Sequence, residues 1–195
     1  MAIELDSATI AASRRGDRAA FRRLVEHYQD RVFGLCTALA GADGEDLAQE
    51  TFVRVHAALA SFDVGRNEKL SSWILTIARR LCADRARNFK RREALRLRIA
   101  PAAPRPGADE ALDDVRRRAT LREAVAALPE EQRAVVALRA WDELEYDAIA
   151  AVEGVPVGTV RSRLARAKQA LKRALGLADG EPGDDEEKRH GSHDA

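Results

Sequence analysis

The sequence predicts an all-α protein made of two small helical domains joined by a flexible linker, with a helix-turn-helix in the C-terminal domain. Three observations lead to this fold class. Apolar residues recur at spacings of three and four along most of the chain, no stretch alternates as a strand would, and a Pro-rich segment interrupts the helical pattern after residue 100. The 195 residues, of which 46% are hydrophobic, are enough for one domain or for two small ones.

The N-terminal domain is expected over residues 1–92. Its first long helix is marked by an apolar stripe over 21–39, its second by a stripe from Leu47 to Phe62, and its third by one from Trp73 to Cys82. The third stripe includes Trp73 itself, which favours a core role for the indole over stacking on a nucleic-acid base.

A linker is expected over residues 93–118. Pro101, Pro104 and Pro106 are followed by Gly107, so this segment cannot continue a helix, and it has too few large apolar side chains to fold alone. A second helical set follows and forms a C-terminal domain over 119–177. Its expected helices cover 116–128, 130–140, 145–152 and 157–175. Residues 178–195 hold seven acidic residues against two basic ones and are expected to form an acidic disordered tail.

The helix-turn-helix is predicted from the spacing of three residues. Ala150 is small enough for close helix approach, Gly154 suits a left-handed turn, and Val160 packs back between the two helices. Pro156 suits the first turn of the second helix. With Val160 facing inward, the outward face of this helix carries the candidate DNA-binding residues Gly158, Thr159, Arg161, Ser162, Ala165, Arg166 and Gln169.

The net charge of +1 conceals a strong segregation of charge. Residues 79–92 hold seven basic residues against Asp84 alone, and 155–173 hold six basic residues and no acidic one. These blocks predict two contacts with a polyanion. For either block taken alone, an ordinary solvated helix face remains the alternative. Arg163 lies toward the core edge of its helix and is expected either to pair with an acidic neighbour or to reach a phosphate.

Several function classes lack support in the sequence. The N-terminus is neither a signal nor a transit peptide and no apolar run is long enough to span a membrane, so we expect a cytoplasmic protein without membrane insertion. No phosphate-binding loop, zinc-protease motif or nucleophile elbow occurs, which predicts neither an enzyme nor a resident cofactor or metal. Cys36 and Cys82 lie in apolar helical contexts, where a buried reduced thiol is favoured over a metal or redox site.

Four segments in series resemble the extracytoplasmic-function sigma factors, the compact two-domain bacterial factors that give RNA polymerase its promoter specificity. A helix-turn-helix alone is shared by many regulators, but the series is specific. The matching segments are AFRRLVEHYQDRVFGLC at 20–36, DLAQETFVRVHAALASF at 46–62, LSSWILTIARRLCADRARNFKRR at 70–92, and 127–171, which includes PVGTVRSRL.

The resemblance implies a role for each group of candidate residues. Asp46, Gln49, Glu50 and Val53 match the helix that docks on the clamp of the largest polymerase subunit. The upstream promoter element is read by the face of the helix-turn-helix named above. The downstream element is recognised and opened by the third helix and the loop before it, which here means Asn67, Arg79, Arg80, Arg87, Lys90, Arg91 and Arg92.

The resemblance also implies partners. They are core RNA polymerase, through its clamp and through its flap region for the C-terminal domain, together with promoter DNA and an anti-sigma factor. An autonomous helix-turn-helix repressor is the alternative function. It would need a dimerisation element to present two half-sites, and none is evident in the sequence.

Overall fold

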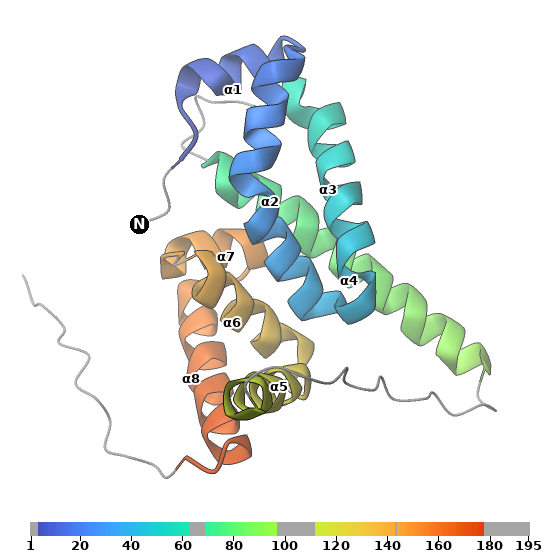
Figure 1. Ribbon diagram of the computed structural model, residues 1–195, viewed down its shortest axis with the longest axis vertical. Helices are drawn as coiled ribbons and strands as arrows, with labels where there is room; N and C mark the ends of the chain where they lie inside the picture. The colour runs from blue at the N-terminus through green and yellow to red at the C-terminus, as the bar shows by residue number, and fades with distance from the viewer. Residues whose placement is uncertain (1–3, 63–68, 97–111, 143, 178–195) are drawn as a thin grey trace, which may run out of the picture.

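The computed structural model describes residues 4–62, 69–96, 112–142 and 144–177 of the chain (Figure 1). All regular structure within these ranges is helical, and they contain no strand. The predicted all-α fold is therefore confirmed.

The N-terminal domain is built around one central helix, α2, which contacts the other three long helices of the domain. Because α2 is surrounded, the middle of its apolar stripe is buried: Leu24, Val32 and Leu35 are at most 1% exposed. The helices are α1 (Ser7–Arg14), α2 (Arg18–Ala40), α3 (Gly44–Ala58) and α4 (Leu70–Arg96), with short 3-10 turns η1 (Gly41–Asp43) and η2 (Leu59–Ser61) flanking α3.

Local chemistry sets the ends of α2 and the start of α3. The carboxylate of Asp17 accepts hydrogen bonds from the backbone N–H groups of Ala19 (2.8 Å) and Ala20 (3.0 Å), which caps α2. Gly41, with φ 59°, ends the helix. Gly44 begins α3 so close to α2 that a Cβ there would lie 2.6 Å from the Cα of Thr37. Glycine at this position therefore sets the α2–α3 separation.

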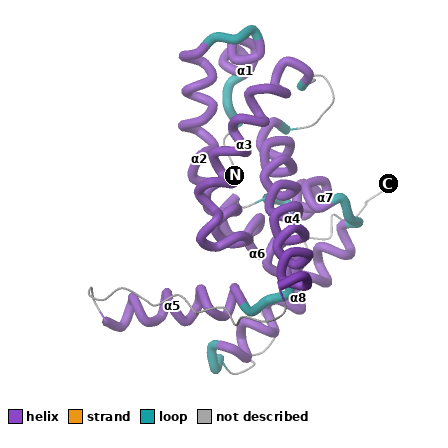
Figure 2. The backbone as a smooth tube through the Cα atoms, turned by 90° about the vertical axis from the view of Figure 1, so that its right-hand side faces the viewer, coloured by secondary structure: helices purple, strands orange, loops and turns teal. Residues whose placement is uncertain are grey.

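The C-terminal domain contains α5 (Leu112–Ala126), α6 (Glu130–Asp142), α7 (Tyr146–Glu153) and α8 (Val157–Ala174). Helices α6 and α7 both pack on α8, whereas α5 projects away from the body of the molecule (Figure 2). The predicted linker limits differ from the observed helix ends. Helix α4 runs to Arg96, since no helix breaker precedes Pro101 in the sequence, and α5 begins at Leu112. Residues 97–111 and the tail 178–195 lie outside the described residues.

The two domains pack directly against each other. Helix α2 contacts α6 and α4 contacts α7, and one cluster of buried side chains extends from Leu35 in α2 to Val135 and Leu138 in α6. A flexible linker predicts that the spacing of the two domains is not fixed in the free chain, and the direct contact between them differs from that expectation. The reason is that α6 is apolar on more than the side that meets α8, since Val135, Ala137 and Leu138 are all at most 1% exposed.

Candidate nucleic-acid and protein interfaces

The helix-turn-helix forms as the sequence predicts. Gly154 adopts the left-handed conformation (φ 66°, ψ 34°) at the end of α7, and its N–H donates to the carbonyl of Ala150. Val160 is fully buried. Pro156 is the N-cap of α8 rather than part of its first turn, with an extended ψ of 148°. The turn therefore consists of Gly154, Val155 and Pro156, which fixes α8 relative to α7.

The outward face of α8 is open to solvent. Arg161, Arg166 and Gln169 are exposed, and no carboxylate of the described residues pairs with either arginine. Ser162 is exposed too, and its hydroxyl donates back to the carbonyl of Thr159 at 3.0 Å. Among the other predicted upstream residues, Gly158 and Ala165 are exposed and Thr159 is half-buried.

A tyrosine contacts one of these arginines. The guanidinium carbon of Arg161 lies 5.8 Å from the centroid of the Tyr146 ring, and that of Arg139 lies 5.4 Å from the same centroid. Arg139 also donates to the carbonyl of Leu144 at 2.8 Å. The ring at the start of α7 thus connects the end of α6 with the exposed face of α8.

The predicted basic residues of α4 separate into two groups. Arg80, Arg87 and Arg91 are exposed, although Arg87 is paired with Asp84 and Arg91 donates to the Asn88 side chain at 3.2 Å. The remaining candidate within the described side chains, Arg79, is largely buried. Asn67 lies outside the described residues, as do the side chains of Lys90 and Arg92.

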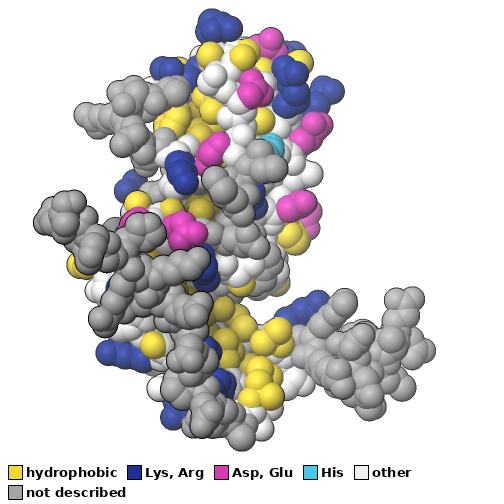
Figure 3. All heavy atoms as spheres, turned by 90° about the vertical axis from the view of Figure 1, so that its left-hand side faces the viewer, with side chains coloured by type: hydrophobic (Ala, Val, Ile, Leu, Met, Phe, Trp, Pro, Cys, Tyr) yellow, Lys and Arg dark blue, Asp and Glu magenta, His cyan; other side chains and the backbone are white. Residues whose placement is uncertain are grey.

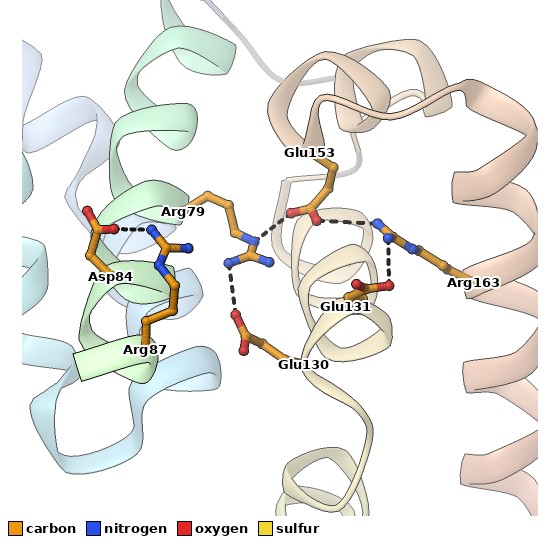
Figure 4. A network of polar contacts seen from close by, with 7 residues as sticks. All are labelled: Arg79, Asp84, Arg87, Glu130, Glu131, Glu153 and Arg163. Atoms are coloured by element: carbon orange, nitrogen blue, oxygen red, sulfur yellow. Dashed lines mark hydrogen bonds and ion pairs between the residues drawn. The ribbon is translucent and has the colours of Figure 1, made fainter. Parts of the chain in front are cut away.

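Arg79 forms ion pairs across the domain interface (Figure 4). Its Nε lies 2.7 Å from Glu153 Oε1 and its Nη1 lies 3.2 Å from Glu130 Oε1. Only 14% of the Arg79 side chain and 3% of the Glu153 side chain are exposed. Burial lowers the pKa of Arg79, but the two carboxylates more than offset this, so the net shift raises it. In this arrangement Arg79 contacts α6 and α7, not the exposed basic surface.

Arg163 of α8 extends the same network. It lies 2.6 Å from Glu131 Oε2 and 3.6 Å from Glu153 Oε2. The sequence predicted either a pair with an acidic neighbour or a phosphate contact for Arg163, and in the structure Arg163 forms the ion pair. Glu153 therefore joins helix α8 to the basic helix α4.

The predicted docking residues lie along one stripe of α3. Asp46, Gln49 and Val53 are exposed, with Val53 at 69%, and Glu50 is half-buried. The Glu50 carboxylate pairs with Arg54 one turn further along at 2.7 Å. The stripe thus combines acidic groups with an accessible apolar side chain, a composition suited to a protein partner that carries basic groups.

The C-terminal domain also exposes apolar side chains. Figure 3 shows hydrophobic side chains gathered on the lower part of the molecule, where α5 and α8 lie. Leu121 of α5 is 46% exposed and Leu177, just after α8, is 59% exposed. These apolar side chains differ in kind from the basic outward face of α8.

Both cysteines are buried between α2 and α4. The interaction with the Cys82 side chain, together with burial, raises the pKa of Cys36. The predicted burial is confirmed, while the reduced state stays a prediction. Among the described residues, no group of three or more His, Cys, Asp or Glu is placed to hold a metal, and no helix is long and apolar enough to cross a membrane.

Two family descriptions match the two domains separately. Sigma-70 region 2 matches residues 24–93, and Sigma-70 region 4 matches residues 118–171. The ECF RNA polymerase sigma factor SigW of Bacillus subtilis is 32% identical over 174 residues, covering 83% of this chain and 92% of SigW. This chain belongs to the ECF sigma factors. It directs promoter-specific initiation of transcription, and these findings favour this function over that of an autonomous repressor.

Further similarities agree with this assignment. The RNA polymerase sigma-H factor of Pseudomonas aeruginosa is 33% identical over 184 residues, covering 88% of this chain and 94% of that factor. A co-crystal structure of the sigma factor RpoE with the anti-sigma factor NepR from Bartonella quintana has a TM-score of 0.67 and 25% identity, covering 81% of this chain and 98% of RpoE.

Sequence reasoning missed three side-chain contacts at the candidate interfaces of this sigma factor. It did not identify Glu153 as the partner of Arg79, it did not place Arg54 beside Glu50, and it did not connect Tyr146 with Arg161. Only the Glu50–Arg54 pair carried a readable signal, because an acidic residue four positions before an arginine is the favourable orientation on a helix.

Proposed function

We propose that this sigma factor reads the upstream promoter element with the outward face of α8. The observation that carries the proposal is an exposed, acid-free helix face, held by a well-formed helix-turn-helix and presenting Arg161 and Arg166 side by side with small residues. Arginine can donate two hydrogen bonds to a guanine edge, and small residues allow close approach to the major groove.

The downstream element is contacted by the exposed arginines of α4. Arg80, Arg87 and Arg91 lie on the solvent side of the helix, where they meet phosphates without leaving a packed position. Asn67, Lys90 and Arg92 belong to the same proposal. Arg79 joins this surface only when its ion pairs with Glu153 and Glu130 break, so its DNA contact requires the two domains to separate.

Core polymerase binds the exposed stripe of α3. Asp46, Gln49 and Glu50 supply acidic and polar groups for a basic helix of the polymerase clamp, and Val53 adds exposed apolar area. The C-terminal domain meets the polymerase flap, for which exposed Leu121 and Leu177 offer apolar contact. An anti-sigma factor binds the same chain and masks its polymerase-binding surfaces. The sigma factor itself works in the cytoplasm and acts only by binding its partners, without catalysing a reaction.

A charge reversal tests the polymerase contact. Glu50→Lys places a cation against a basic partner but leaves the buried stripe of α3 untouched, so it should abolish co-purification with core polymerase while helicity stays unchanged. Losing the half-exposed pair with Arg54 costs stability only about 0.5 kcal/mol or less. Glu26→Lys, the same charge change at an exposed position of α2, is the matched control and should bind core normally. Normal core binding by Glu50→Lys would refute the α3 contact.

A further inference from the structure

We propose that Tyr146 is a positioning residue that holds Arg161 in place to read one base of the upstream element. This inference rests on the proposed function of the α8 face. It adds a residue that lies outside that face, on the first helix of the helix-turn-helix, and assigns it a share of the sequence specificity.

The geometry places the aromatic ring within reach of the arginine. Tyr146 is the first residue of α7 and Arg161 lies in the second turn of α8, and the distance from the guanidinium carbon to the ring centroid is 5.8 Å. A guanidinium within about 6 Å of an aromatic centroid is attracted by the negative face of the ring. Arg161 is otherwise exposed, and no carboxylate of the described residues draws it elsewhere.

The ring itself is firmly held. Tyr146 is half-buried and packs against the hydrophobic core, so its position is set by the fold and not by the solvent. Arg139 approaches the same ring at 5.4 Å and is anchored by its hydrogen bond to the Leu144 carbonyl, directly before α7. The platform for Arg161 is therefore connected to two elements of the domain.

An arginine held beside an aromatic ring is suited to base recognition. The face of the ring attracts the guanidinium, while the N–H groups at the edge of the guanidinium remain able to donate to a guanine. Restricting the side chain before binding reduces the ordering cost that binding must meet. Arg166 is exposed on the same helix face, and no aromatic ring among the described residues lies over or under its guanidinium, so it provides an internal comparison.

The test measures base discrimination in the complete holoenzyme. Core polymerase is assembled with the wild-type chain, Tyr146→Leu, Tyr146→Phe, Arg161→Ala, and the Tyr146→Leu/Arg161→Ala double variant. Run-off transcription is then measured on promoters with each base pair of the upstream element changed in turn. Arg161→Ala should remove discrimination at one position, and Tyr146→Leu should weaken it at that same position by about two- to fivefold.

The remaining variants separate positioning from folding. Tyr146→Phe keeps the ring and should behave like the wild type, and Tyr146→Leu should add nothing to Arg161→Ala at the affected position. A further variant, Arg166→Ala, should weaken base discrimination at its own position of the upstream element. Discrimination at that position should be unchanged in Tyr146→Leu. The inference would be overturned if Tyr146→Leu reduced transcription equally at all positions of the upstream element. It would also be overturned if the effects of Tyr146→Leu and Arg161→Ala on base discrimination multiplied in the double variant.

Two further outcomes are decisive. If Arg161→Ala leaves every position unchanged, the upstream contact of Arg161 is refuted along with its positioning, whereas a normal Arg161→Ala effect without coupling refutes the role of Tyr146 alone. A measurement on the unmodified chain does not depend on how the variants fold. Protons of the Arg161 side chain should show a ring-current shift in NMR spectra that the Arg166 side chain lacks, and its absence would also overturn the inference.

Discussion

Replacing Glu153 by glutamine should destabilise the protein far more than the loss of an ordinary surface carboxylate. Glu153 links the two domains and also contacts helix α8, because Arg79 pairs with one of its carboxylate oxygens and Arg163 lies near the other. Glutamine keeps the size of the side chain and an oxygen that accepts hydrogen bonds. It removes the charge that balances two arginines whose side chains are only 14% and 15% exposed.

The size of the effect follows from what each arginine retains. Removing one partner of a buried ion pair typically costs about 3–5 kcal/mol, because the other charge is left uncompensated. In this network Arg79 still has Glu130 at 3.2 Å, and Arg163 still has Glu131 at 2.6 Å. These remaining carboxylates are more exposed than Glu153 and compensate only in part, so we expect a loss of about 2–3 kcal/mol.

Urea unfolding followed by circular dichroism measures this loss. Asp43→Asn is the matched control, because it also neutralises a carboxylate paired with an arginine at 2.7 Å, but both side chains of that Asp43–Arg85 pair are nearly half exposed. Its free energy of unfolding should change by about 0.5 kcal/mol or less. Equal and small losses in the two variants would refute the argument that Glu153 stabilises the domain interface.

Two further predictions concern α2 and α3. Gly44→Ala should lower the unfolding midpoint in urea, because the added Cβ would lie 2.6 Å from the Thr37 backbone, whereas Gly158→Ala, with no atom within 4 Å of the added Cβ, should not lower it. Asp17→Ala should lower the melting temperature near neutral pH by removing the α2 cap. Hydrogen bonds from Ala20 and Ala19 lower the pKa of Asp17, so its contribution is present above the ordinary aspartate pKa and is lost as pH falls through the lowered folded value. A difference in melting temperature that persists unchanged in acid would contradict this assignment.

The sequence was most informative where structure depends on local spacing. The apolar stripes predicted the helices, and Ala150, Gly154 and Val160 predicted the helix-turn-helix, because all these signals lie within one or two helical turns of each other. The exposed face of α8 followed directly, since fixing Val160 as buried also fixes which residues point outward.

Contacts between distant segments were not predictable in this way. Arg79 and Arg80 look alike in a basic run, and only Arg79 meets Glu153, which lies 74 positions away. The domain contact of α6 was missed because its apolar residues could all be assigned to the core of its own domain. The close approach of Gly44 to Thr37 becomes visible only once α2 and α3 are placed side by side.

We expect this sigma factor to select promoters only as part of the polymerase holoenzyme. In the free chain the two domains pack together and Arg79 is held by Glu153 and Glu130, so the two proposed DNA-binding surfaces are fixed in an arrangement set by protein contacts. Short basic surfaces acting alone give mostly salt-sensitive, non-specific affinity. Core polymerase that holds both domains at promoter spacing makes the second DNA contact effectively intramolecular.

Fluorescence anisotropy with a promoter duplex and a scrambled duplex at physiological salt tests this claim directly. The free chain should bind both duplexes with similar affinity, and adding core polymerase should produce a clear preference for the promoter. Strong promoter-specific binding by the free chain, or no preference in the presence of core polymerase, would contradict the account.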